Sequence, residues 1–262
     1  MRILITGAGR AIGRATAVEL ITRGHDVVAT ARDVSLLADL EDARVQALDV
    51  TDDASVAACF DAVGELDAVV NNAAVIGSGP LEDYPLDRLR QVLETNTIGA
   101  LRVAQAVVPA WRARGSGVIV NVSSVQGRVA TPLEGPYAAS KHALEAISET
   151  LHYELGHFGI RIVLIEPGYI APGMKRGDDH RGLPAYDDLW AQWTGTDAKL
   201  NGPDGRPGPE IVATAIGDAI EDPTTPLRVP VGADAEMILA TRARLSDDRF
   251  EAALRSTLDF HW

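Results

Sequence analysis

Three side chains capable of acid–base chemistry stand close together in the middle of the chain: Ser124, Tyr137 and Lys141. Tyr137 and Lys141 are four residues apart, so on a helix they share one face. Ser124 follows the apolar run 117–122, which is typical of a buried strand. A hydroxyl at a strand end, a phenol and an ammonium in one cleft suit proton transfer at a carbonyl. We expect the neighbouring cation to lower the pKa of Tyr137 from its usual value of about 10.

Each part of this set also has an ordinary structural explanation. A tyrosine and a lysine at this spacing often occupy a solvated helix face, and serines after a strand often form a turn or a helix cap. The glycine-rich stretch 6–13 strengthens the functional interpretation, because it follows the apolar segment 3–5 and precedes a helical pattern. Strand, glycine turn and helix together are the context of a dinucleotide phosphate site. A tight turn that binds no ligand is the alternative for this stretch alone.

Apolar segments alternate with helical patterns along most of the chain. Predicted strands cover residues 3–5, 26–31, 45–48, 67–70, 117–122, 161–165 and 227–231. Helical patterns cover residues 14–22, 54–63, 85–114, 135–158 and 209–220, and most of the tail after 233. This alternation predicts an α/β fold: a Rossmann-like, doubly wound parallel sheet of about seven strands, with helices on both faces, in a single domain of residues 1–262. Asn96 and Gly99 lie inside one helical pattern and predict a local opening that holds a water.

Composition excludes several classes of function. The net charge of −13 argues against nucleic acid and anionic membrane surfaces as partners. No apolar run is long enough to span a bilayer and no signal peptide is visible, so we expect a cytoplasmic protein. The single cysteine, Cys59, excludes an internal disulfide and is expected in the core. The histidines lack metal-ligand spacing, so no metal site is predicted, and Ser124 lacks the flanking glycines of an α/β-hydrolase.

The end of the second predicted strand bears on the choice of cofactor. An NAD site favours a carboxylate there, which binds the ribose hydroxyls. This chain has Ala31 and then Arg32, with Arg10 in the glycine turn. Two arginines suit a 2′-phosphate, which predicts NADP(H), with NAD(H) as the alternative. In that alternative Arg32 is solvated and Asp33 binds the ribose, although Asp33 could equally cap a short helix around residues 36–40.

Residues 171–209 interrupt the alternation with many glycines and prolines. A long insert in a compact domain is typical of a functional lid, here with a short helix near residues 186–193. Its large apolar residues are candidates for substrate contact: Met174, Tyr186, Trp190 and Trp193. They indicate a bulky apolar or cyclic substrate, but packing against another subunit explains them nearly as well. The aromatic terminus, 259–262, is expected to pack on a neighbouring subunit.

From residue 3 to about residue 170, these motifs resemble the single-domain short-chain dehydrogenase/reductases. Residues 30–33 are similar to those of the NADP-linked hydroxysteroid, retinol and carbonyl reductases in that family. The catalytic tetrad of the family falls on Asn96, Ser124, Tyr137 and Lys141. Its cofactor site falls on Gly7, Gly9, Arg10, Ala11, Ile12, Gly13, Arg32, Asp49, Val50, Asn72, Ala73, Tyr137, Lys141, Pro167, Gly168 and Ile170.

Three residues depart from the usual pattern of the family. Ala11 and Ala74 each replace a glycine, and Pro172 replaces a threonine that often contacts the carboxamide. We expect the methyl group of Ala11 to crowd the cofactor and Ala74 only to shape the pocket. The contact to the carboxamide is in doubt at Pro172.

The resemblance implies an NADP(H)-dependent oxidoreductase that interconverts a ketone or aldehyde and an alcohol. Tyr137 would exchange the proton, Ser124 would bind the reacting oxygen, Lys141 would lower the tyrosine pKa and hold the nicotinamide ribose, and Asn96 would anchor a water that relays protons to Lys141. The family also implies a homodimer or homotetramer, with a small molecule as substrate. Two alternatives remain: an epimerase or dehydratase on the same scaffold, and a non-catalytic NADP(H) sensor.

Overall fold

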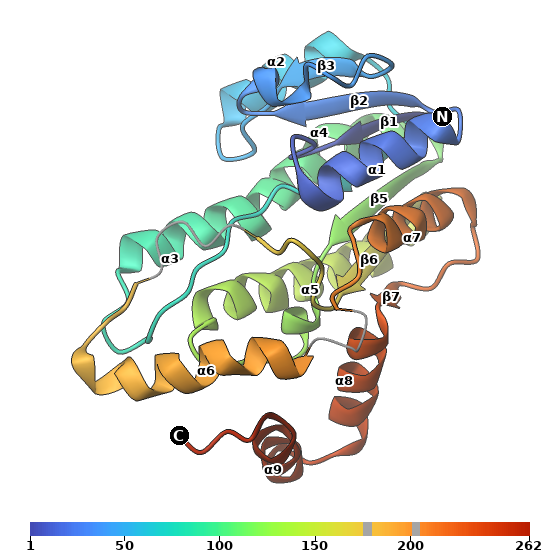
Figure 1. Ribbon diagram of the computed structural model, residues 1–262. Helices are drawn as coiled ribbons and strands as arrows, with labels where there is room; N and C mark the ends of the chain where they lie inside the picture. The colour runs from blue at the N-terminus through green and yellow to red at the C-terminus, as the bar shows by residue number, and fades with distance from the viewer. Residues whose placement is uncertain (175–179, 201–204) are drawn as a thin grey trace.

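The computed structural model describes residues 1–174, 180–200 and 205–262. Their strands form one parallel sheet of seven strands in the order β3-β2-β1-β4-β5-β6-β7 (Figure 1). The strands are β1 (Arg2–Ile5), β2 (Asp26–Ala31), β3 (Arg44–Ala47), β4 (Ala68–Asn71), β5 (Gly117–Val122), β6 (Ile160–Pro167) and β7 (Arg228–Val231). The predicted doubly wound sheet is confirmed, and each predicted strand ends within two residues of the observed one.

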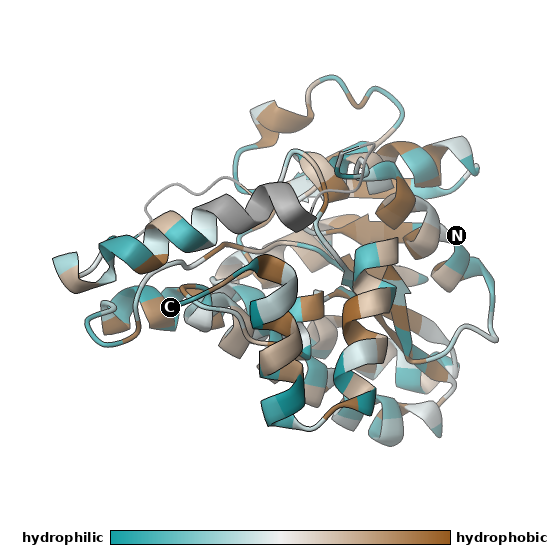
Figure 2. Ribbon diagram, turned by 60° about the horizontal axis from the view of Figure 1, so that its bottom comes forward, coloured by the Kyte–Doolittle hydropathy of each residue, from teal (hydrophilic) through white to brown (hydrophobic). Residues whose placement is uncertain are grey.

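Helices cover both faces of this sheet (Figure 1). One face carries α1 (Ala11–Thr22) and α7 (Glu210–Glu221), and the other carries α2 (Asp53–Val63), α4 (Gly99–Arg114) and α5 (Gly135–Gly156). Side chains alternate along each strand, so Ile3 and Ile5 pack toward α1 while Leu4 packs toward α4. Figure 2 shows the apolar residues gathered on the strands and the helix surfaces that meet them. Burial on both faces explains why the strands are continuous apolar runs.

The order of the strands reverses between β1 and β4. In an open parallel sheet, ligands bind outside the carboxyl ends of the strands at such a reversal. The glycine turn follows β1, Asn72 follows β4, and Ser124 lies two residues after β5. The sheet therefore places the predicted motifs at one edge.

The predicted long helix over residues 85–114 is interrupted at Asn96. The chain forms α3 (Leu86–Leu93), one turn of π-helix (Glu94–Ile98) and then α4. Asn96 lies inside the π turn with only 2% of its surface exposed. A π turn inserts one residue into the helical ladder and is frequent at functional sites. The local opening that the sequence predicts therefore takes this form.

The C-terminal third adds three helices below the carboxyl edge of the sheet (Figure 1). A short 3-10 turn (Pro184–Tyr186) leads into α6 (Asp187–Leu200), which is longer than the predicted helix, and α8 (Ala233–Arg244) and α9 (Asp247–Leu258) follow. Phe260 is 4% exposed and its ring lies 6.0 Å from that of Trp193, centre to centre. The expectation that the aromatic terminus packs on a neighbouring subunit is therefore corrected for Phe260, which packs on α6 of its own chain. In the part of the chain that the structure describes, no helix is long and apolar enough to cross a membrane.

Candidate active site

Ser124, Tyr137 and Lys141 come together beyond the carboxyl end of β5. The hydroxyl of Ser124 hydrogen-bonds to the side chain of Tyr137. Lys141 Nζ lies 5.6 Å from the centre of the Tyr137 ring and donates a hydrogen bond to the carbonyl oxygen of Val122 at 2.7 Å. The phenol, the hydroxyl and the ammonium thus share one small volume, as a group that handles a proton and a carbonyl oxygen would require.

Burial controls the acid–base properties of this group. Lys141 is 3% exposed, and its removal from water lowers its pKa to about 8, against the opposing charge of Glu145. Burial also raises the pKa of Tyr137; the carboxylate of Glu134 raises it further, while the hydrogen bond from Ser124 lowers it. The expected lowering of the Tyr137 pKa is not met in this structure, because desolvation of the phenolate outweighs the stabilising contacts.

Asn96 connects the π turn to the helix that carries Tyr137 and Lys141. Its amide Nδ2 donates to the carbonyl oxygen of Val75 at 2.8 Å and to Ser140 Oγ at 2.9 Å, and its Oδ1 accepts from the Val75 N–H at 2.8 Å. Ser140 Oγ in turn donates to the carbonyl oxygen of Tyr137 at 2.7 Å. These bonds hold the π turn against Val75 and α5, and the part of Asn96 in anchoring a water stays a prediction.

The glycine turn after β1 forms a cradle in which no side chain would fit. A Cβ atom on Gly13 would lie 2.3 Å from the carbonyl oxygen of Gly7 and 2.4 Å from Asn72 Nδ2. That Nδ2 donates to the carbonyl oxygens of Thr6 and Gly7 at 3.0 and 3.1 Å. Asn72, predicted to contact the cofactor, therefore holds the turn against the end of β4. Such close backbone packing at a helix N-terminus fits a pyrophosphate.

Ala11, which stands where the family usually has a glycine, adopts a backbone conformation that favours glycine. It is the first residue of α1, and its φ of 45° lies in the left-handed region that favours glycine. An L-residue there costs about 1–2 kcal/mol relative to right-handed backbone. The methyl group itself is exposed. The alanine thus acts through strain in the turn, in addition to the crowding expected from sequence.

Arg32 directly follows the last residue of β2. Both Arg32 and Arg10 are exposed. Burial raises the pKa of Asp49, but hydrogen bonds from Thr51 and the charges of nearby arginines outweigh burial, so the pKa is lowered overall. Arg32 is one of these arginines and therefore lies close to Asp49. Asp33 instead accepts hydrogen bonds from Ser35 and caps the 3-10 turn Val34–Leu37. Asp33 therefore acts as a helix cap, and the turn that it caps begins at Val34, two residues before the predicted helix.

The other predicted cofactor residues lie along the same edge of the sheet: Gly9 and Ile12 in the first turn, Val50 after β3, Ala73 after β4, and Pro167, Gly168 and Ile170 at the end of β6. Sequence reasoning missed the residue that fixes this last segment, Asp234. Its Oδ2 accepts from the Tyr169 N–H at 2.7 Å, and a Cβ atom on Gly168 would lie 2.2 Å from it. The only sequence signal for Asp234 is an acidic residue in the first turn of a helix.

Two buried polar side chains beside the site were also missed. Gln126 and Glu134 are each 5% exposed, and the Gln126 amide hydrogen-bonds to the Glu134 carboxylate. Leu133, which precedes Glu134, has a φ of 63°. A non-glycine residue in that region is strained, and such strain is frequent at active sites. The charge of Glu134, the next residue, raises the pKa of Tyr137.

Three of the four predicted substrate residues lie together, because Tyr186 packs against the apolar cluster that contains Trp190 and Trp193. Met174 is 40% exposed, and Tyr186 donates a hydrogen bond to Glu82 at 2.5 Å. Trp190 and Trp193 are 3% and 4% exposed and pack in one apolar cluster: Leu133, Leu189, Trp190, Trp193, Leu258 and Phe260. The tryptophans therefore pack within their own chain rather than against another subunit, and their contact with a substrate stays a prediction. Because Leu133 belongs to this cluster, α6 rests on the loop between Ser124 and Tyr137.

Truncation of Phe260 to alanine should loosen α6 over that loop. We expect the free energy of unfolding to fall by about 3 kcal/mol, because the ring leaves a cavity against Trp193. Tryptophan emission should shift to the red as Trp193 becomes hydrated. Phe158→Ala is the matched control, since that ring is 38% exposed at the end of α5. Equal effects of the two substitutions would show that Phe260 does not hold α6.

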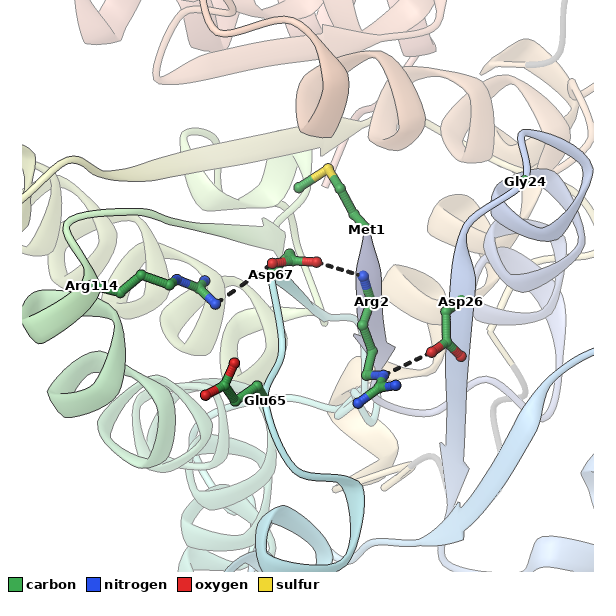
Figure 3. Close-up of a pocket in the computed structure, with 7 residues that line it drawn as sticks. All are labelled: Met1, Arg2, Gly24, Asp26, Glu65, Asp67 and Arg114. Atoms are coloured by element: carbon green, nitrogen blue, oxygen red, sulfur yellow. Dashed lines mark hydrogen bonds and ion pairs between the residues drawn. The ribbon is translucent and has the colours of Figure 1, made fainter.

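A pocket of about 400 Å³ lies at the opposite, amino-terminal end of the strands (Figure 3). Four of its charged side chains are paired: Arg2 Nε contacts Asp26 at 2.7 Å, the Arg2 N–H donates to Asp67 at 2.7 Å, and the Arg114 guanidinium contacts Asp67 at 3.5 Å. Among the described residues, no group of three or more potential metal ligands is present. The candidate site therefore remains at the carboxyl edge.

Comparison with known proteins agrees with this geometry. The family model described as short chain dehydrogenase matches residues 1–181. The chain is 32% identical to the uncharacterized oxidoreductase YusZ of Bacillus subtilis over 273 residues, which cover 97% of each protein. It is 36% identical to retinol dehydrogenase 8 of Homo sapiens over 251 residues, which cover 86% of this chain and 79% of that protein.

Solved structures show the same relation. A short-chain dehydrogenase from Streptomyces avermitilis superposes with a TM-score of 0.83 at 31% identity, covering 98% of this chain and 97% of the other. One from Burkholderia cenocepacia, in complex with NADP, gives 0.76 at 25% identity, covering 98% and 96%. The chain therefore belongs to the short-chain dehydrogenase/reductase family and is an NAD(P)-dependent oxidoreductase. The predicted family and enzyme class are confirmed.

Proposed function

We propose that this enzyme uses NADP(H) to interconvert a ketone or aldehyde and an alcohol, with Tyr137 as general acid and base. The observation that carries the proposal is the hydrogen bond between the side chains of Ser124 and Tyr137, with Lys141 Nζ 5.6 Å from the phenol ring. Two hydroxyls that lie this close together can both hydrogen-bond to one substrate oxygen. The epimerase, dehydratase and sensor alternatives have no observation of their own in their favour.

The cofactor, held by the glycine cradle of Gly7, Gly9 and Gly13, supplies or accepts the hydride when bound. Everything else is done by side chains of this chain. In reduction, Tyr137 gives its phenolic proton to the substrate oxygen while the Ser124 hydroxyl donates a hydrogen bond to the same oxygen as negative charge develops there. In oxidation, the phenolate takes the proton back.

The direction of the pKa shifts favours reduction near neutral pH. Burial keeps the pKa of Tyr137 above its usual value, so the phenol carries its proton and is ready to donate it. Lys141 keeps its positive charge below a pKa of about 8 and can then stabilise the tyrosinate that donation leaves behind. Both groups are thus in the form required for reduction on the acidic side of pH 8.

We propose a bulky apolar or ring-containing substrate. The similarity to a retinol dehydrogenase supports this class. So does the apolar cluster of Trp190, Trp193 and Leu133, which provides a rigid hydrophobic wall behind the loop that joins Ser124 to Tyr137. We also propose a homodimer or homotetramer formed through α5, where Ala139, His142 and Ala146 leave one helix face exposed. Light scattering of the purified enzyme measures the oligomeric state.

Arg32→Ala should remove a preference for NADPH over NADH. We expect the wild type to bind NADPH at least about tenfold more tightly, because a guanidinium at the end of β2 can pair with the 2′-phosphate. The variant should lose that difference with NADH affinity unchanged. Fluorescence titration with both cofactors measures it, and Arg90→Ala is the control, since Arg90 is exposed on α3 and pairs with Asp87. Equal binding of both cofactors by the wild type would refute the 2′-phosphate assignment.

A further inference from the structure

Glu145 is a buried carboxylate one helical turn after Lys141 on α5. It is 4% exposed, and its Oε2 accepts a hydrogen bond from Arg228 Nε at 2.9 Å. Its Oε1 is buried as well and has no hydrogen-bond partner among the residues that the structure describes. A buried carboxylate oxygen without a partner is destabilising and uncommon. The ion pair with Arg228 therefore accounts for the burial of Oε2 but not for that of Oε1.

The unpartnered oxygen lies under the loop that follows Ser124. A Cβ atom on Gly127 would lie 3.1 Å from Glu145 Oε1 and 2.7 Å from Ser123 Oγ. Ser123 Oγ is also buried, and it has no hydrogen-bond partner in the part of the chain that the structure describes. The absence of a side chain on Gly127 thus lets the loop close over the carboxylate. Glu145 and Lys141 are both buried and lie one helical turn apart on α5.

The charged form of Lys141 requires a negative charge nearby. Among the described residues, no carboxylate oxygen lies within 4.0 Å of Lys141 Nζ, the distance limit for an ion pair. Nζ donates its hydrogen bond to the carbonyl oxygen of Val122, which is uncharged. An ammonium buried without a counter-charge tends to lose its proton. The carboxylate charge that acts on Lys141 through space is that of Glu145.

We propose that Glu145 is a positioning residue for Lys141: its buried carboxylate is the counter-charge that keeps the buried ammonium charged. The inference rests on the proposed function only in giving Lys141 a part in catalysis. The role of Glu145 itself follows from its burial, its unpartnered oxygen and its place beneath the serine loop. Its pairing with Arg228 also fixes the carboxylate, because β7 is part of the rigid sheet.

A second buried carboxyl group adjusts this arrangement. Glu166, at the end of β6, is 1% exposed. Burial, and after it the charge of Glu145, raise the pKa of Glu166 to about 7. Arg128 at 3.4 Å and Arg228 at 4.0 Å oppose this rise. Above pH 7 Glu166 therefore carries a second negative charge, beside Glu145 and the two arginines.

The titration of Lys141 tests this proposal directly. The chain has only three lysines, Lys141, Lys175 and Lys199, so a protein labelled with [13C]lysine gives few signals, assigned with Lys175→Arg and Lys199→Arg. We expect Glu145→Gln to lower the titration midpoint of Lys141 by about one pH unit from its wild-type value. Glu145→Asp, which keeps the charge, should restore most of the shift and serves if Glu145→Gln does not fold.

Glu149→Gln is the matched control. Glu149 lies one turn further along α5 and accepts from the same guanidinium, at 2.6 Å from Arg228. Its removal perturbs Arg228 but not Lys141. An unchanged midpoint in Glu145→Gln, or an equal shift in Glu149→Gln, would overturn the proposal. The titration needs no turnover: a shifted midpoint in an enzyme inactive toward all ketones would support the role of Glu145 and refute the proposed function.

Discussion

Tyr137→Phe is expected to lower kcat/KM for ketone reduction by about 10³-fold, the scale of a lost general acid. The substitution removes one oxygen and keeps the ring that packs near Lys141, 5.6 Å from its Nζ. NADPH affinity should therefore stay close to that of the wild type, and the loss should fall on kcat. Steady-state kinetics with NADPH and a cyclic ketone, together with a fluorescence titration of NADPH, separate the two effects.

Tyr153→Phe provides the control for that experiment. Tyr153 is on the same helix, is 73% exposed and hydrogen-bonds to Glu149 at the surface. Its substitution should leave the rate unchanged. In the wild type, kcat/KM for reduction should be constant near neutral pH and fall above about pH 8, where Lys141 loses its proton. Turnover by Tyr137→Phe at the wild-type rate would assign the proton to another group.

The sequence predicts those parts of the fold and site that depend on spacing. Alternating apolar segments define the sheet because each strand is buried on both faces. Tyr137 and Lys141 share a face because any helix brings residues four apart together. The glycine turn is recognisable because only glycine fits at Gly13, where a Cβ atom would meet the backbone of Gly7. These constraints are local, so they are visible in a single chain.

The electrostatics of the site depend on segments far apart in sequence and are not visible in this way. Glu145 resembles an ordinary polar position of an amphipathic helix, and Arg228, its partner, is 83 residues away. Desolvation of Tyr137 likewise follows from packing. Spacing alone predicts that the cation of Lys141 lowers the pKa of Tyr137, but it misses the larger effect of burial, which raises that pKa. Trp193 shows the same limit, because the apolar surface that covers it comes from the distant C-terminus at Phe260.

The same dependence on distant segments makes Asn96→Ala the most disruptive substitution outside the proton-transfer group. Its side chain makes three hydrogen bonds: two partly buried ones to Val75 after β4 and one buried one to Ser140 on α5. Alanine would leave these groups unpaired at a cost of about 1–3 kcal/mol each. We expect a loss of about 3 kcal/mol in the free energy of unfolding, measured by urea denaturation.

Activity should fall with it by about 10²-fold, since Ser140 also bonds to the backbone of Tyr137, and a small displacement of a reacting group has effects of this size. Thr95→Ala is the control from the same π turn, because its hydroxyl makes one exposed bond within the helix, to Gln91. A variant at Asn96 that lost stability but kept its turnover would show that α5 is held in place without the amide. Loss of both, with Thr95→Ala unaffected, would establish the π turn as the element that sets the position of Tyr137 against Ser124.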